Sequence, residues 1–100
     1  MNEPTPKPKV IDAVIQCDRQ ELRCARLRNL DTAGVFAVVA EPRLLKEDMA
    51  VKFSFTTREH GEKCVHLLRA TVQQVTPEGA RLEFGDLDLG TYSTLLHLAS

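Results

Sequence analysis

The sequence predicts a small antiparallel β-barrel of about six strands, followed by one α-helix. Two observations lead to this fold class. Most of the chain consists of short segments in which apolar and polar residues alternate, and turn-forming residues separate these segments. Near the C-terminus the apolar residues take up the spacing of a helix instead. Such a series of strands suits a barrel or a sandwich, and closure into a barrel would hide the exposed strand edges.

The composition indicates a single globular domain. The chain has 100 residues, of which 43% are hydrophobic, and a formal net charge of −1. This charge gives no long-range attraction to nucleic acid or to an anionic membrane. No apolar run approaches the ~20 residues that cross a bilayer, and the polar N-terminus does not resemble a signal peptide. We therefore expect a cytoplasmic protein without membrane insertion.

The residues that usually carry catalysis or metal binding form no known pattern. The three cysteines, an odd number without a CxxC pair, indicate neither a disulfide framework nor a zinc site, and we expect reduced thiols. The three histidines lack the spacing of metal ligands. No nucleophile–base pair, phosphate-binding glycine loop or carboxylate pair is present. The sequence thus predicts no enzyme, no metal site and no cofactor.

Residues 1–9 are expected to form a flexible tail, and residues 10–100 to form the barrel domain with its helix. Three prolines in the tail prevent regular pairing, since proline lacks an N–H donor. The alternation from Val10 to Cys17 predicts the first strand, with a turn at residues 18–21. Leu22 to Leu30 is expected to return as the second strand, with Ala25 and Leu27 facing inward. Helix is the competing prediction for residues 20–28, which favour it by composition.

The centre of the chain predicts four further strands. Residues 35–40 are apolar enough for a strand that is buried on both faces, and residues 41–48 follow as a loop. A strand with alternate apolar residues begins near Val51, and a hairpin loop at residues 58–62 leads to a long strand from Cys64 to Val75. After a turn at residues 76–79, the last strand turns alternate residues inward. The side chains expected inward are Val51, Phe53, Phe55, Ala80, Leu82 and Phe84.

The last segment predicts a helix that begins after Asp88. The Asp88 carboxylate can accept hydrogen bonds from the first free N–H groups and faces the positive end of the helix dipole. Leu89, Tyr92, Leu95 and Leu96 fit one face of this helix. Because a short helix cannot bury these residues by itself, we expect that face to pack over an opening of the barrel.

The turn between the second and third strands carries a recognisable motif. Asn29, Asp31 and Gly34 fall in a segment where Asn and Asp can bond the backbone and Gly allows reversal of the chain. This segment resembles the (D/N)xSxxG signature of the PilZ family, with Asp31 at the usual Ser position. The order of strands and helix resembles a PilZ domain from about Val10 to Leu98. The resemblance implies a small β-barrel and, in many family members, binding of cyclic di-GMP.

Family members that bind this ligand usually carry an RxxxR pair before the first strand, and this chain has none there. Lys7 and Lys9 are the only cations at that position. Arg19 and Arg23 have the RxxxR spacing but follow the first strand, so we do not assign them this role. Missing arginines remove charge-assisted hydrogen bonds of about 1.5–3 kcal/mol each, and a carboxylate at Asp31 would repel a phosphate. Weak or lost nucleotide binding is therefore expected.

The resulting functional expectation is a PilZ-like binding or adaptor module of cyclic di-GMP signalling that acts through protein partners. Any ligand is expected at Arg28, Asn29, Asp31, Gly34, Lys7 and Lys9. A partner protein is expected at Leu44 and Leu45, since apolar loop residues often form recognition surfaces. One alternative is a functional cyclic di-GMP receptor. Another is a nucleic-acid-binding barrel that uses the basic face of Arg23, Arg26 and Arg28.

Overall fold

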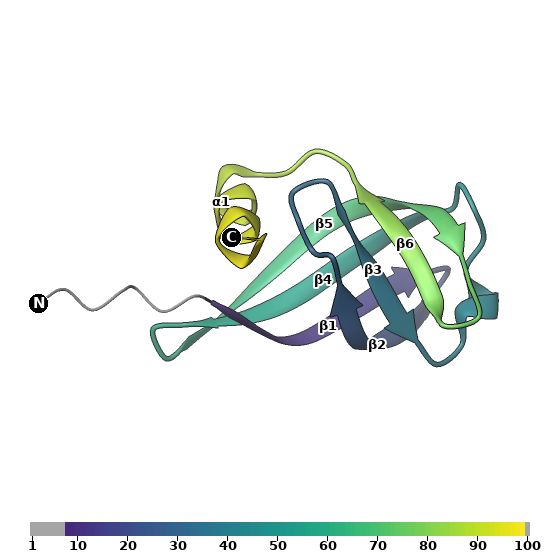
Figure 1. The fold of residues 1–100 in the computed structure, drawn as a ribbon, viewed down its shortest axis with the longest axis horizontal. Coiled ribbons are helices and arrows are strands. Elements are labelled where there is room, and N and C mark those ends of the chain that lie inside the picture. The colour runs from purple at the N-terminus through teal and green to yellow at the C-terminus, as the bar shows by residue number, and fades with distance from the viewer. Residues whose placement is uncertain (1–7, 100) are drawn as a thin grey trace, which may run out of the picture.

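The computed structural model describes residues 8–99, and these form a closed six-stranded antiparallel β-barrel with one C-terminal helix (Figure 1). The predicted fold class is confirmed. The elements are β1 (Lys9–Cys17), β2 (Gln20–Arg28), β3 (Gly34–Val39), the short 3-10 helix η1 (Pro42–Leu44), β4 (Ala50–Glu59), β5 (Glu62–Val75), β6 (Gly79–Phe84) and α1 (Leu89–Ala99). The predicted tail lies outside the described residues, apart from Pro8 and from Lys9, where β1 begins. In the part of the chain that is described, no helix has the length and apolar character needed to cross a membrane.

Two pairings between strands that are distant in sequence close the barrel. The order around it is β1-β2-β3-β6-β5-β4, and β4 pairs with β1 again. β3 pairs with β6 along its length, from Gly34 opposite Glu83 to Val38 opposite Gly79. The β4–β5 hairpin is the longest in the barrel, and it reaches beyond the other strands beside α1 (Figure 1). Every strand is therefore paired on both sides.

Alternation along the strands places the core where the sequence predicted it. Val51, Phe53 and Phe55 in β4 are buried, and so are Ala80, Leu82 and Phe84 in β6. The aromatic rings form the centre: Phe53 lies 5.8 Å from Phe55 and 5.7 Å from Phe84 between ring centroids. Such offset and tilted contacts stabilise a core beyond the area that they bury. The inward and outward faces are therefore set by a period of two.

The second strand departs from the prediction at one residue. Leu27 is half-buried as expected, but Ala25 is exposed. The pairing of β2 with β3 shifts register between Cys24 and Arg26, so Ala25 is the extra residue of a bulge. A bulge reverses the alternation, so Leu22 and Cys24 face inward on one side of it and Leu27 does so on the other. The first turn is also tighter than predicted, because only Asp18 and Arg19 separate β1 from β2.

The loop between β3 and β4 buries one of its two leucines. Leu45 belongs to the core with 3% of its surface exposed, whereas Leu44 is half-buried and packs against it. The loop therefore folds onto the barrel. As a consequence Leu45 cannot contact a partner protein, because its side chain already fills the interior.

The terminal helix begins at the predicted residue but buries a different face. The Asp88 carboxylate accepts a hydrogen bond from the Thr91 N–H at 2.7 Å, as a helix cap does. The buried residues of α1 are Thr91, Thr94 and Leu95, whereas Leu89, Tyr92 and Leu96 are exposed. Leu95 is buried as predicted, but the prediction for the other three residues was wrong, because it considered hydrophobicity alone.

A polar contact explains why threonine faces the barrel. The His66 ring of β5 stacks on Phe55 and bonds the hydroxyls of Thr57 and Thr91, at 3.5 and 3.3 Å. The barrel thus presents a polar ring to the helix, and a threonine satisfies it where a leucine could not. The contact between α1 and the barrel is therefore partly polar, through Thr91, and partly apolar, through Leu95.

We expect Leu95→Ala to lower the free energy of unfolding by about 2–5 kcal/mol, because it leaves a cavity in a fully buried position. Leu96→Ala, one residue further along the same helix, should change it by less than about 0.5 kcal/mol, because Leu96 is exposed. Urea denaturation of both variants makes the comparison. Equal losses of stability would contradict the observed orientation of α1.

The pKa of Asp88 is lowered from its ordinary value of 3.8, chiefly by the hydrogen bond from the Thr91 backbone. A carboxylate whose pKa falls on folding stabilises the protein above that ordinary value, and this contribution disappears as pH drops through the lowered one. We expect Asp88→Ala to lower the melting temperature at neutral pH, and the difference from wild type to shrink below pH 3.8. Thermal scans across pH measure this, and a difference that does not change with pH would argue against the charged cap.

Candidate ligand-binding surface

The turn between β2 and β3 uses each of its motif residues to hold the backbone. Asn29 has a left-handed φ of 54°, a conformation that asparagine tolerates better than most residues. The Asp31 carboxylate accepts hydrogen bonds from the N–H groups of Ala33 and Gly34, at 2.8 and 2.9 Å. The N–H of Asp31 in turn donates to the Gly34 carbonyl at 3.0 Å. Asp31 therefore fixes the turn with its own side chain.

Gly34 is required because β3 and β6 approach closely at this point. A Cβ atom on Gly34 would lie 2.1 Å from the carbonyl oxygen of Leu82. No real Cβ atom tolerates that distance from a backbone atom, so only glycine allows the pairing. The three motif residues thus have sufficient structural reasons to be present, whatever the turn binds.

Beside this turn, a row of four outward-facing side chains crosses the barrel surface. Arg28 of β2 is opposite Phe36 of β3, Phe36 is opposite Arg81 of β6, and Arg81 is opposite Gln74 of β5. Together with Asn29 these residues line a shallow depression of about 430 Å³. Phe36 is half-buried and has an arginine on either side. The arrangement offers a flat apolar ring flanked by planar cations.

One of the two arginines in this row, Arg28, already interacts with neighbouring side chains. The Arg28 guanidinium lies over the Phe36 ring, with its central carbon 5.5 Å from the ring centroid. The same guanidinium forms an ion pair with Glu78 at 2.6 Å. Arg81 forms no ion pair with any of residues 8–99. A planar anionic ligand could therefore bond Arg81 directly, but to stack on Phe36 it would have to displace Arg28 from the ring, and it would compete with Glu78 for that guanidinium.

The remaining predicted ligand residues are not part of this depression. Lys7 lies outside the described residues. Lys9 is exposed at the start of β1, where it pairs with Arg58 of β4. Of the predicted ligand residues, only Arg28 and Asn29 line the depression, and Asp31 and Gly34 build the adjoining turn.

Three lining residues were missed by the sequence analysis: Phe36, Gln74 and Arg81. Phe36 lies in an apolar strand that was predicted to be buried on both faces, so it gave no sign of an accessible ring. Arg81 was predicted to face outward, but its position opposite Phe36 follows from the pairing of β3 with β6. The sequence holds no signal for this face, because every residue from Val35 to Val39 is apolar, and the alternation of half-buried Phe36 and Val38 with buried neighbours is visible only in the structure.

A larger and less open groove lies at the other end of the strands. Its volume is about 780 Å³, and its lining includes the turn from β1 to β2, the start of β4 and the middle of β5. The charged residues along it are of both signs: Asp18, Arg19, Glu21, Lys52 and Arg69. This mixture gives no charge preference for one class of small ligand.

The described cysteines and histidines provide no metal centre. Among residues 8–99, no three His, Cys, Asp or Glu side chains are grouped as a metal ion would require. The three cysteines are free, and Cys17 is paired with Gln20 in the hairpin, not with Cys24. Burial, with a smaller effect of Asp12, raises the pKa of Cys24 to about 12, so this thiol is not a nucleophile at neutral pH.

A comparison of the chain with protein families, with curated proteins and with solved structures finds no match.

We expect Asp31→Ala to lower the free energy of unfolding by about 1–3 kcal/mol, because two backbone N–H groups lose their acceptor. Asp31→Asn should lower the free energy of unfolding much less, because the amide oxygen can accept the same hydrogen bonds. Chemical denaturation of the two variants measures the difference. If both variants were as stable as the wild type, the carboxylate would not be holding the turn.

Proposed function

We propose that this chain is a PilZ-like binding module of cyclic di-GMP signalling that acts through protein partners and binds the nucleotide weakly or not at all. The proposal rests on the closed six-stranded barrel with its terminal helix, and on the Asn29–Gly34 turn between β2 and β3. One observation carries it above all: the depression beside this turn combines an aromatic ring with arginines on both sides. That is the chemistry suited to a guanine base and its phosphate.

The same depression accounts for the weakness of the proposed binding. Arg28 is held by Glu78 at 2.6 Å, so a phosphate would have to displace a carboxylate. Arg81 is then the one lining arginine without an ion pair among residues 8–99. A dinucleotide with two phosphates needs more cations than this, and each missing charge-assisted bond costs about 1.5–3 kcal/mol. Asp31 adds little repulsion of its own, because its carboxylate is turned towards the Ala33 and Gly34 N–H groups.

Nucleic-acid binding receives less support. Of the three arginines on β2, Arg23 is 4.0 Å from Asp12, and Arg28 pairs with Glu78. Phe53, Phe55 and Phe84 are buried, which leaves Phe36 as the one phenylalanine with an accessible ring for base stacking. A strand of nucleic acid would need a longer row of stacking side chains and free cations.

Calorimetric titration with cyclic di-GMP tests the proposal. We expect the wild type to bind with a dissociation constant above ~100 μM or not at all. Glu78→Gln should bind more tightly, by about tenfold or more, because it frees Arg28 for the ligand. Arg81→Gln in the Glu78→Gln background should remove most of that gain. Arg26→Gln is the matched control, since Arg26 is exposed on the same β2 strand but does not line the depression.

Micromolar binding by the wild type would contradict the weak-binding proposal and favour a functional receptor. No change in Glu78→Gln would mean that the Phe36 row is not a nucleotide surface. Steeply salt-dependent binding to single-stranded oligonucleotides, with no response to cyclic di-GMP in either protein, would instead favour the nucleic-acid alternative.

A further inference from the structure

The outer face of the β4–β5 hairpin leaves two aliphatic side chains in solvent. Val65 and Leu67 of β5 have 70% and 58% of their surfaces exposed, although both lie in the middle of a long paired strand. Their partners across the hairpin are Thr56 and Ser54 of β4. Val14 of β1 is opposite Ser54 and extends the apolar strip onto a third strand. This face is opposite to the one that carries His66 and contacts α1.

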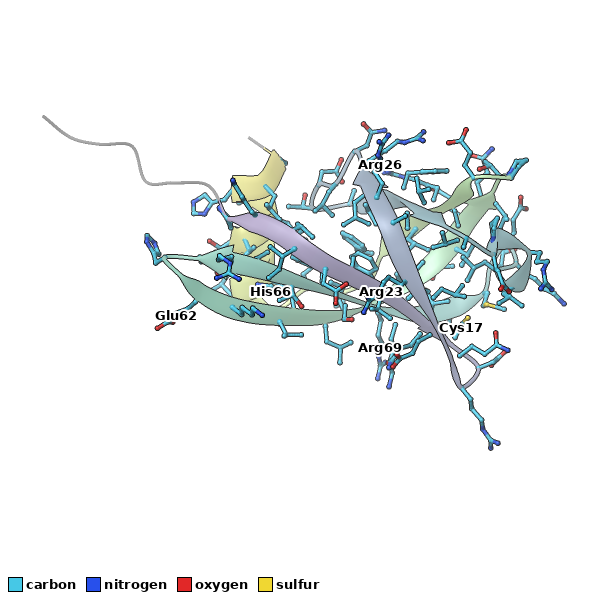
Figure 2. All side chains as sticks on the ribbon, turned by 90° about the horizontal axis from the view of Figure 1, so that it is seen from below. Cys17, Arg23, Arg26, Glu62, His66 and Arg69 are labelled. Atoms are coloured by element: carbon cyan, nitrogen blue, oxygen red, sulfur yellow. The ribbon has the colours of Figure 1, made fainter. Side chains whose placement is uncertain are left out.

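Two pairs of cations bracket this apolar centre. Arg58 is directly opposite Lys63 near the hairpin tip, and Lys52 is directly opposite Arg69 further along. All four residues are exposed and share the face of Val65 and Leu67 by alternation. Figure 2 marks the tip with Glu62 and locates Arg69 well along β5, with its side chain directed away from the barrel. The two cationic rows are six residues apart along β4, or about 20 Å.

Like charges in directly opposite positions of a sheet destabilise it, yet this hairpin has two such pairs. None of the four cations forms an ion pair with any of residues 8–99. Among the nearby acidic residues, Asp18 lines the same groove as Lys52 and Arg69, and Glu83 of β6 is exposed opposite Thr71, but neither forms an ion pair within residues 8–99. Asp12 pairs with Arg23, Glu21 accepts a hydrogen bond from Gln16, and Glu59 and Glu62 belong to the opposite face by alternation. The four cations around the apolar centre therefore have no ion-pair partner among residues 8–99.

We propose that this surface, made of Lys52, Arg58, Lys63, Val65, Leu67 and Arg69, docks an acidic segment of a partner protein whose apolar centre covers Val65 and Leu67. Charge complementarity selects the partner: carboxylates at both ends of the segment would neutralise the two rows, and the contact would bury the exposed aliphatic side chains. This inference deepens the proposed function, because it supplies the surface through which an adaptor would act. It replaces Leu44 and Leu45 as the predicted partner site.

Other occupants fit the same observations less well. In a symmetric dimer formed through this face, the cationic rows of one copy would lie against those of the other and repel them. Nucleic acid would meet aliphatic side chains and no stacking ring. An anionic lipid surface is uniform, whereas these cations are confined to two rows with a narrow apolar strip between them.

Selection from a displayed library of random peptides, with the full-length protein as target and no nucleotide present, tests the inference. We expect the selected peptides to have Asp or Glu on both sides of Leu, Ile, Val or Phe. Their addition should shift the backbone amide NMR signals of Val65, Leu67 and Arg69. Val65→Thr with Leu67→Thr should weaken binding by about tenfold or more, and Lys52→Gln with Arg69→Gln should do the same and reduce its salt dependence.

The matched control is Arg26→Gln with Lys46→Gln, which removes two exposed cations from other parts of the surface and should leave binding unchanged. All substituted positions are exposed, and unaltered melting temperatures would verify that the variants fold. The inference would be overturned if no peptide were selected, or if the peptides shifted signals elsewhere. It would also be overturned if the variants lost binding to phosphatidylglycerol vesicles, to an oligonucleotide or to a second copy of the chain, while their binding to the peptides did not change. Because no nucleotide is present, failure here is distinguishable from failure of the cyclic di-GMP titration.

Discussion

The close approach of β3 and β6 is the constraint on which the rest of this barrel depends. Gly34 and Gly79, at opposite ends of the shared pairing, each lie where a side chain could not fit. A Cβ atom on Gly34 would meet the Leu82 carbonyl oxygen at 2.1 Å, and one on Gly79 would meet that of Ala37 at 1.9 Å. The two clashes are reciprocal, since each glycine faces the backbone of the other strand. This pairing joins residues far apart in sequence and closes the barrel.

The same pairing creates the candidate ligand-binding surface. Phe36 and Arg81 are neighbours only because β3 and β6 are in this register, and Arg28 and Gln74 extend the row through the flanking strands. The turn that contains Asn29, Asp31 and Gly34 sets where β3 begins and therefore sets the register. Asp31 and Gly34 therefore shape the surface through the backbone, whereas Asn29 lines the depression itself.

Local patterns in the sequence were enough to predict the fold class, because alternation and turn chemistry are local properties. Val51, Phe53 and Phe55 predicted the inward face of β4, and Asp88 predicted the start of α1. The errors arose where contacts between residues far apart in sequence determine which side chains are buried. Ala25 faces solvent because a bulge forms against β3, and Thr91 is buried because His66 needs a hydrogen-bond partner. Phe36 could not be recognised as a surface ring before its strand neighbours were known.

The measurement that tests this account most directly is the stability of Gly79→Ala beside Gly90→Ala. A Cβ atom at Gly90 would meet only the Asp88 carboxylate oxygen, at an ordinary 3.5 Å, and alanine suits a helix better than glycine does. We expect Gly79→Ala to lose about 1–3 kcal/mol of unfolding free energy or fail to fold, and Gly90→Ala to be unchanged or more stable. A Gly79→Ala protein as stable as the wild type would show that β3 and β6 do not approach as described, and the Phe36 row would lose its basis.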